Sequence, residues 1–284
     1  MDATVGAMLD QLDRLGIADN TLFVFVSDHG TKGKWTLHDH NGTAVPCIMR
    51  WPKVIKARSV SSGLIQTTDF VPTFLDIAGV KKPDGYRVDG ISLRPMFSNP
   101  ANAIHEHLFF ELGNARGVRT GDWKHIAVRY NTEHFARIQS VNLMRLPRAL
   151  AYIGNDKTLS NQLGRRPHYL ESDQLYHLGK DPLEANNLAH DTEYSEQLKK
   201  MKSVLLRELE PQARPFGEFI PSSNSVPVED IQPYLRKLTQ LTPIKRGFEI
   251  VGPTSSTGDA VPKIRTPEER KRRRDERQKN RTEK

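Results

Sequence analysis

Apolar residues recur with two different periods in the first fifty residues. Over residues 1–15 they follow helical spacing, and Gly16 stands where a helix would end. A turn at Asp19–Asn20 leads into residues 22–26, a short apolar run without polar alternation, which is typical of a strand covered on both faces in a parallel sheet. Helix, turn and buried strand in this order form half of a βαβ unit. The pattern therefore predicts an α/β fold with a partial doubly wound sheet.

Two further elements are predicted before the next change of pattern. Residues 45–51 form a second short apolar run, which predicts another strand. Residues 67–69 (Thr-Thr-Asp) are types that cap helix N-termini, and the apolar positions after them predict a helix that ends at Gly79. Residues 80–102 are rich in Pro, Gly, Asp and Asn, and we expect a loop there.

The period changes after residue 104. Short alternating runs separated by Gly-Asn and Gly-Asp dipeptides predict an antiparallel meander. Residues 131–170 show no clear period, and we expect loops and a short helix there. Gln174–Leu178 is predicted to be a strand, and a helix capped by Asp191 or Thr192 is predicted to end at Pro211. Together these elements predict a small α+β domain with an antiparallel sheet and a C-terminal helix.

The last part of the chain is predicted to have little order. Residues 212–284 show no apolar period, and Lys263–Lys284 contains eleven Lys or Arg and five Asp or Glu. Because this segment carries +6 of the net charge of +8, the basic character belongs to the tail and not to a folded surface. We expect domains at 1–103 and 104–212 and a disordered basic tail at 213–284.

Composition narrows the class of protein. No apolar run approaches the ~18 residues that cross a bilayer. The N-terminal segment is amphipathic and lacks the basic and apolar regions of a signal peptide. The single cysteine, Cys47, rules out an internal disulfide. The pattern does not favour nucleic-acid binding by the tail, because acidic residues interrupt its arginines.

Candidate chemistry lies at the end of the first predicted strand, in the sequence Ser-Asp-His-Gly. Open α/β sheets bind ligands at the carboxyl ends of their strands, and Asp28 and His29 lie at such an end. A hard divalent cation takes carboxylate oxygens, and an imidazole can fill one position. Lys34 follows, and an ammonium beside a cation suits an anionic ester whose charge both would share. The alternative is an ordinary turn in which Asp28 caps the next segment.

Several blocks in consistent order resemble the sulfatase family. The first three, LDRLGIADNTLFVFVSDHG, GKWTLHDHNGTAVPCIMRWP and TTDFVPTFLDIAGV, are similar to the second half of its catalytic domain, and RGVRTGDWKHI and DQLYHLGKDPLEANNLA are similar to its C-terminal domain. The resemblance implies hydrolysis of sulfuric esters of small molecules or carbohydrates, in a periplasmic or secreted location. It also implies that Asp28 and His29 bind Ca²⁺ or Mg²⁺ and that Lys34 contacts the sulfate in catalysis.

The chain departs from the family pattern in two places. The spacing from Lys34 to Val45 is one residue longer than is usual, and Ala44 replaces an arginine. Members also carry a Cys/Ser-x-Pro-x-Arg motif that is converted to formylglycine, the nucleophile. Cys47 lies in VPCIMR and does not fit that motif, so we expect a buried strand thiol. We therefore expect the missing N-terminal half to supply the nucleophile and further metal ligands, and the chain alone to be inactive.

Other hypotheses stay open at this stage. A phosphodiesterase or phosphonate hydrolase of the alkaline-phosphatase-like superfamily would use the same Asp-His pair. A non-catalytic truncated product with a basic anion-binding tail would have no covalent step. The triplet His38-Asp39-His40 could bind a metal, but we expect it to be solvated in a loop. His105 and His107 alternate along a predicted strand and would share one face.

Overall fold

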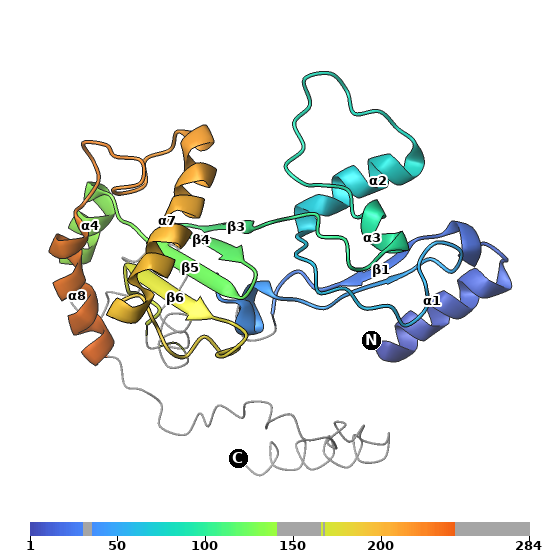
Figure 1. Cartoon of the computed structure of the whole chain (residues 1–284), viewed down its shortest axis with the longest axis horizontal. Coiled ribbons are helices and arrows are strands. Elements are labelled where there is room, and N and C mark those ends of the chain that lie inside the picture. Colours follow the sequence, from blue (N-terminus) through green and yellow to red (C-terminus); the bar gives the residue numbers. More distant parts are fainter. Residues whose placement is uncertain (31–35, 141–165, 167, 242–284) are drawn as a thin grey trace, which may run out of the picture. The chain divides into compact units, whose positions relative to one another are not determined.

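A computed structural model describes residues 1–30, 36–140, 166 and 168–241. The chain divides into the units Met1–Arg246 and Gly247–Lys284, and all described residues belong to the first. That unit contains a two-stranded sheet and a four-stranded sheet with their helices (Figure 1). Every helix in the described part of the chain is too short or too polar to cross a membrane.

The elements predicted for the first eighty residues are present. Gly16 and Gly79 follow the ends of two helices with φ angles of 66° and 64°, the left-handed conformation that glycine adopts after a helix. Residues 67–69 form a 3-10 turn that leads into the second helix, and the Asp69 carboxylate accepts a hydrogen bond from the Gln66 N–H at 2.7 Å as part of a capping box. The elements are α1 (Asp2–Arg14), η1 (Ala18–Asn20), β1 (Phe23–Val26), β2 (Cys47–Arg50), η3 (Thr67–Asp69) and α2 (Phe70–Ala78).

Strand β1 differs from the prediction in its pairing and burial. It pairs antiparallel with β2, with Phe23 opposite Arg50 and Val26 opposite Cys47. Its residues are half-buried or exposed, and Val26 is 37% exposed. The mixed α/β class is confirmed, but the parallel pairing of this strand is wrong. An unbroken apolar run does not report pairing direction, because side chains alternate between faces in parallel and antiparallel strands alike.

A short helix lies in the segment 80–102, which was predicted to be only a loop. It is α3 (Arg94–Ser98), and Leu93 at its start is buried in a small core with α2. Asp69 is fully buried, and its Oδ1 accepts hydrogen bonds from the Ile91 N–H at 2.9 Å and from His105 Nε2 at 2.8 Å. These contacts fix the loop against the start of α2. His105 and His107 both precede the first strand of the next sheet, which begins at Leu108, so the prediction that they alternate along a strand is wrong.

The second sheet is the antiparallel meander that the sequence predicts. Its order is β3-β4-β5-β6, and Gly113 and Gly121 occupy the two tight turns with φ angles of 54°. In the β4–β5 pair Arg119 lies directly opposite Lys124, so the two side chains share a face. The strands are β3 (Leu108–Leu112), β4 (Ala115–Thr120), β5 (Trp123–Val128) and β6 (Asp173–His177).

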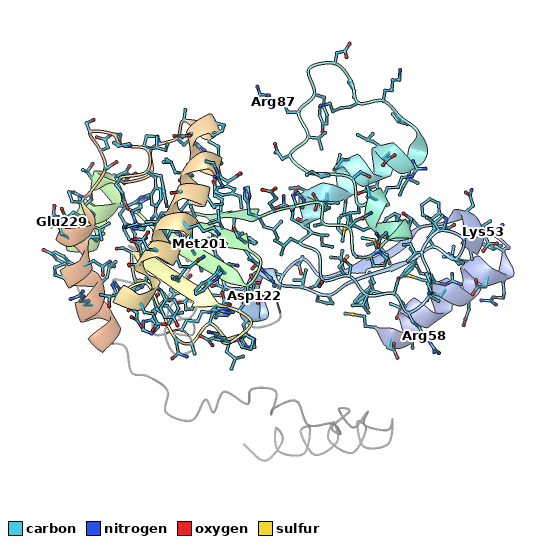
Figure 2. All side chains as sticks on the ribbon, viewed as in Figure 1. Lys53, Arg58, Arg87, Asp122, Met201 and Glu229 are labelled. Atoms are coloured by element: carbon cyan, nitrogen blue, oxygen red, sulfur yellow. The ribbon has the colours of Figure 1, made fainter. Side chains whose placement is uncertain are left out.

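Helix α7 (Ser195–Leu209) packs on one face of this sheet (Figure 1). Met201 and Leu205 of the helix are fully buried against Val118 and Leu175 of the strands. Met201 lies on the side of α7 that faces the sheet (Figure 2). Burying a side chain of this size stabilises the fold by about 1.5–3 kcal/mol. The helix follows the 3-10 turn η5 (Thr192–Tyr194), which Asp191 caps, and leads into η6 (Glu210–Gln212).

The opposite face of the sheet is covered by a helix that the sequence analysis did not expect. This helix is α8 (Val228–Leu241), and Ile231 and Leu235 are buried beside Ile126 and Tyr176. Residues 228–241 were expected to lack an apolar period, and that expectation is wrong. The two apolar residues are one helical turn apart, but Pro233 lies between them inside the helix and obscured the pattern.

The segment expected to contain loops and a short helix is only partly described. Helix α4 (Thr132–Ser140) confirms the short helix. Residues 141–165 and 167, and the predicted basic tail from residue 242 onward, lie outside the described residues. The domain boundaries at 103 and 212 stay predictions.

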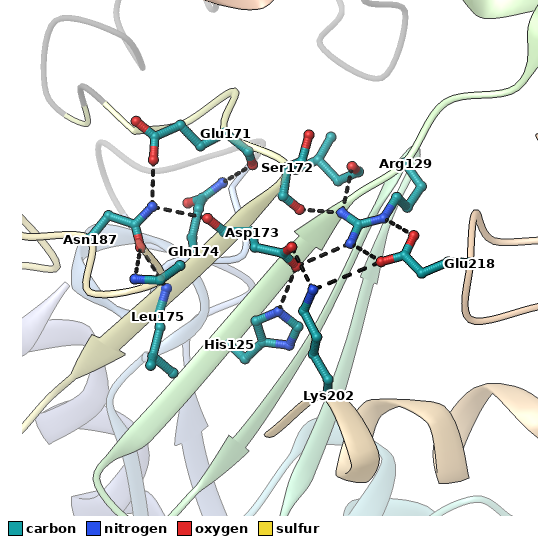
Figure 3. A network of polar contacts seen from close by, with 12 residues as sticks. His125, Arg129, Glu171, Ser172, Asp173, Gln174, Leu175, Asn187, Lys202 and Glu218 are labelled. Carbon is teal, nitrogen blue, oxygen red and sulfur yellow. Dashed lines mark hydrogen bonds and ion pairs between the residues drawn. The ribbon is translucent and has the colours of Figure 1, made fainter. Parts of the chain in front are cut away.

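A network of charged side chains joins β5, β6 and α7 (Figure 3). The Asp173 carboxylate accepts hydrogen bonds from His125 Nε2 and Arg129 Nη2, each at 3.1 Å, and from Lys202 Nζ at 2.6 Å. Arg129 also contacts Glu218 at 2.5 Å. Burial would raise the pKa of Asp173, but His125 and the two cations outweigh burial and hold this pKa well below its usual range. The network therefore keeps Asp173 ionised.

Candidate functional site

Asp28 and His29 lie immediately after β1, at its carboxyl end, as the sequence predicts. Asp28 Oδ1 accepts a hydrogen bond from the His29 N–H at 3.0 Å, and Ser27 Oγ donates to the His29 carbonyl at 2.8 Å. The Gly30 N–H donates to the Gly42 carbonyl at 2.9 Å. A turn therefore holds both side chains at the strand end, and its backbone is tied to the segment around residue 42.

The hydrogen bonds of His29 select the tautomer that a metal ligand needs. His29 Nδ1 lies 2.8 Å from the Gly30 carbonyl, which can only accept, so Nδ1 carries the proton. In the neutral ring the lone pair is then on Nε2, which lies 3.3 Å from Asp28 Oδ2. Two ligands at right angles, each ~2.4 Å from a Ca²⁺ ion, would be ~3.4 Å apart. The spacing fits two neighbouring ligands of one cation, and it equally fits an ion pair between Asp28 and a protonated His29.

The pair supplies only part of a coordination shell. Ca²⁺ takes about 6–8 oxygen ligands. Among the described residues, no group of three or more His, Cys, Asp or Glu is arranged to hold a metal ion. The Asp28 side chain is 84% exposed, so it has room for further ligands around it. Lys34, the predicted sulfate contact, lies outside the described residues.

Both residues line an open pocket of about 750 Å³. Strands β3 and β4 contribute Phe109, Glu111 and Arg119 to its lining. Cys47 also lines it from β2, and burial raises the pKa of its thiol. Cys47 is half-buried and not fully buried as predicted, because one side of β2 faces the pocket. The pocket thus combines the candidate cation ligands with a cationic side chain from the second sheet.

A π turn, η2 (Asp39–Thr43), forms another part of the pocket lining. It was expected to be solvated, but Asp39 is 8% exposed and His38 before it is 1% exposed. His38 Nδ1 lies 2.6 Å from Thr36 Oγ1, and burial holds the pKa of His38 well below its usual value. The ring is therefore neutral and packed in the core, and the expectation of solvent exposure is wrong for His38 and Asp39.

Two cations from the second sheet bind the Asp39 carboxylate. Lys124 Nζ donates to Asp39 Oδ1, and Arg119 Nη1 lies 2.5 Å from Oδ2. Lys124 is fully buried, with Nζ also 3.1 Å from Thr43 Oγ1 and 4.0 Å from the centre of the Phe110 ring. Burial opposes ionisation of Asp39, but Lys124 and then Arg119 outweigh it and lower its pKa. Asp39 is therefore an anion that two adjacent cations share.

The backbone of His40, in the same turn, is held at both ends. Glu184 Oε2 accepts from the His40 N–H at 2.9 Å, and Arg166 Nη2 donates to the His40 carbonyl. Glu184 is 1% exposed, and its Oε1 has no hydrogen-bond partner among the described residues. Burial raises the pKa of Glu184 to about 7. The turn is thus fixed by side chains that come from four separate places in the later part of the chain.

The contacts within this group of residues were not predicted, although the sequence contains one signal of them. The segment Arg-Thr-Gly-Asp-Trp-Lys is a hairpin whose turn places Arg119 opposite Lys124. Two like charges directly opposite on one face are destabilising unless an anion lies between them. That conflict predicts a buried carboxylate nearby, but it does not identify Asp39, which is 85 residues away from Lys124.

Comparison with known proteins identifies the family. The family model described as Sulfatase matches residues 1–80, which include β1, the Asp28–His29 pair and the η2 turn. An ulvan-active sulfatase from Formosa agariphila is 32% identical over 246 residues, which are 81% of this chain and 45% of that protein. The chain belongs to the sulfatase family. An N-acetylglucosamine-6-O-sulfatase from Bacteroides thetaiotaomicron is 29% identical over 72% of the chain and 33% of its own length.

Solved structures show the same fold for this sulfatase chain. One, of a protein in complex with its substrate D-glucosamine-2-N,6-O-disulfate, has a TM-score of 0.51 at 24% identity and covers 74% of this chain and 38% of that one. A second structure, from work on the metabolism of glycosaminoglycans by Bacteroides thetaiotaomicron, has a TM-score of 0.52 at 20% identity. The match covers 74% of this chain and 43% of that one. The sulfatase chain spans less than half the length of these relatives.

The general chemistry of the sulfatase family has two requirements against which these residues can be compared. Sulfatases use a metal ion and a formylglycine, and the Asp28–His29 pair fits the first requirement by its donor atoms, tautomer and spacing. Cys47 does not fit the second, because it lies within β2 in a sequence without the Pro and Arg of the motif. The phosphodiesterase alternative is not favoured, because the family match and both curated relatives are sulfatases.

Proposed function

We propose that this chain is the C-terminal half of a sulfuric ester hydrolase. Asp28 and His29 bind a Ca²⁺ or Mg²⁺ ion, and Lys34 contacts the sulfate of the substrate. The observation that carries the proposal is the pair of donor atoms at the end of β1, 3.3 Å apart with the His29 proton on Nδ1, inside the segment that matches the family. A bound divalent cation supplies charge stabilisation at the sulfate oxygens as the ester bond breaks.

The chain's own residues contribute binding and orientation under this proposal. The carboxylate of Asp28 offers oxygens, and Gly30 holds the His29 ring so that Nε2 points to the same ion. Lys34 is an ammonium donor to an anionic group. The nucleophile and the remaining metal ligands come from sequence that this chain does not contain, and the chain alone is inactive.

The distribution of exposed apolar side chains supports a missing protein surface. Among the described residues, all large hydrophobic side chains that are exposed, except Tyr234, lie within residues 1–91. They include Met8 of α1 at 53%, Ile48 of β2 at 61% and Phe74 of α2 at 49%. Such an accumulation marks surfaces that pack against other protein. It coincides with the part of the chain in which the sheet has only two strands.

A sulfated carbohydrate is the proposed substrate class. The names of the relatives refer to ulvan and to N-acetylglucosamine, and one related structure holds a disulfated glucosamine. The pocket beside Asp28 and His29 has a volume of about 750 Å³, and its lining offers Glu111 and Arg119 as polar contacts for a sugar.

A chimaera tests the proposed function. The full chain replaces the matching C-terminal part of the ulvan-active sulfatase from Formosa agariphila, and the product is assayed on an aryl sulfate and on an aryl phosphate diester. We expect Ca²⁺-dependent hydrolysis of the sulfate ester, and no hydrolysis by the 284-residue chain alone. A folded chimaera that cleaves the phosphate diester and leaves the sulfate intact would overturn the proposal.

A further inference from the structure

In the cluster of Asp39, Arg119, Lys124 and Thr43, the polar side chains are hydrogen-bonded to one another. Both oxygens of Asp39 are used, because Oδ1 accepts from Lys124 and from Thr43 Oγ1 at 3.0 Å and Oδ2 accepts from Arg119. The Lys124 ammonium has a carboxylate, a hydroxyl and the Phe110 ring around it. Every charged group in the cluster therefore has a partner, although two cations share one carboxylate.

Such a cluster is a poor source of stability. Taking a lysine and a carboxylate out of water costs several kcal/mol per ion, and the attraction between them repays that cost only in favourable geometry. Apolar residues of the same volume would often stabilise the fold at least as well. The cluster does fix the orientation of the η2 turn. The Asp39 carboxylate must face Lys124 and Arg119 for both contacts to form.

The η2 turn is in turn connected to the candidate cation site. The carbonyl of Gly42, inside the turn, accepts the hydrogen bond of the Gly30 N–H at 2.9 Å. Gly30 directly follows His29, and its own carbonyl holds His29 Nδ1 at 2.8 Å. A displacement of the turn would therefore move the backbone that orients the His29 ring, even though Lys124 touches neither Asp28 nor His29.

We propose that Lys124 is a positioning residue: through Asp39 it fixes the η2 turn, and through Gly42 and Gly30 it orients the His29 ligand. The meander sheet thereby acts on the site at the end of β1. Sulfatase chemistry is the proposed function that this role would serve. The geometric claim, that β5 controls the backbone at Gly30, stands independently of it.

Hydrogen–deuterium exchange at the Gly30 amide tests this in the full 284-residue chain without metal or substrate. We expect Lys124→Met and Asp39→Asn each to speed that exchange by about tenfold or more, since each breaks the same contact to a charged group. The double variant should exchange no faster than Asp39→Asn alone, because Lys124 is proposed to act on the turn only through Asp39. Lys202→Met is the matched control: it removes a lysine–aspartate contact in the network around Asp173, and the Gly30 amide should exchange as in the unchanged chain.

The outcomes separate positioning from general stabilisation. A folded Lys124→Met chain with unchanged exchange at Gly30 would overturn the proposal, and so would an equal acceleration in Lys202→Met. An unprotected Gly30 amide in the unchanged chain would also overturn it. If circular dichroism shows that Lys124→Met does not fold, the partly exposed Arg119 is replaced instead, and Arg119→Gln is judged by the same criterion. If the chimaera lacks sulfatase activity while Gly30 responds as expected, the proposed function fails and the positioning role remains.

Discussion

Replacing Glu184 by glutamine should remove a large pH dependence of stability. Glu184 is 1% exposed, and burial raises the pKa of its carboxyl from 4.5 to about 7. Each pKa unit corresponds to about 1.36 kcal/mol, so the difference amounts to about 3 kcal/mol. Glutamine keeps an acceptor oxygen for the His40 N–H at 2.9 Å but cannot ionise.

The sign follows from where the proton is bound. Between pH 4.5 and 7 the folded chain retains a proton on Glu184 that the unfolded chain has lost. The contribution of this group to stability is therefore complete below pH 4.5 and is lost as the pH rises through about 7. Relative to the unchanged chain, Glu184→Gln should gain about 3 kcal/mol in free energy of unfolding between about pH 4.5 and pH 8.

Urea unfolding followed by tryptophan fluorescence at several pH values measures this difference. Carboxylates with lowered pKa values, such as Asp173, titrate in both chains and cancel in the comparison. Glu196→Gln is the control, because its side chain is 82% exposed and its removal should change the difference by well under ~1 kcal/mol. A Glu184→Gln difference that is the same at the two ends of the pH range would refute the argument that this carboxyl is buried and protonated.

Three further predictions concern packing and charge, each measured by urea unfolding at pH 7. Ile231→Ala should lower the free energy of unfolding by about 2–5 kcal/mol, because Ile231 in α8 is only 2% exposed. Val71→Ala, at a 48% exposed site, should lower it far less. Equal losses in the two variants would contradict the placement of α8. Gly90→Ala should be strongly destabilising, because a Cβ atom there would lie 2.2 Å from the Thr68 carbonyl oxygen; an unaffected variant would contradict that close approach. Asp173→Asn should cost about 3–5 kcal/mol, because it removes the carboxylate that Lys202 and the buried Arg129 share and leaves them only Glu218 in this network; a neutral effect would contradict the network of Figure 3.

Local patterns predicted the elements well where one face is apolar. The period of 3.6 residues gave α7, and its buried Met201 and Leu205 lie on the face that the spacing indicates. The turn dipeptides predicted the meander, because its tight turns need a residue at positive φ, as at Gly121. Helix α8 was missed although its sequence has apolar residues at helical spacing, because Pro233 within it is usually a helix breaker.

The candidate site could be predicted only in part. The position of Asp28 and His29 follows from the end of β1, which is a local feature. The tautomer of His29 depends on the Gly30 carbonyl, and the burial of Asp39 depends on Lys124 from a distant strand. A backbone contact of this kind and a partner from a distant strand leave no period in the sequence. The pairing direction of β1 was mispredicted for the same reason, because it depends on which strand lies beside it and not on its own residues.

The central claim, that Asp28 and His29 are cation ligands of a sulfatase, is tested most directly in the chimaera with single substitutions. Aryl sulfate hydrolysis is measured for Asp28→Asn, for His29→Ala and for Asp10→Asn, an exposed residue of α1 that serves as the control. We predict a loss of about a hundredfold or more for the first two variants, partly reversed at high Ca²⁺, and an unchanged rate for the control. Full activity in a folded Asp28→Asn chimaera would contradict the account.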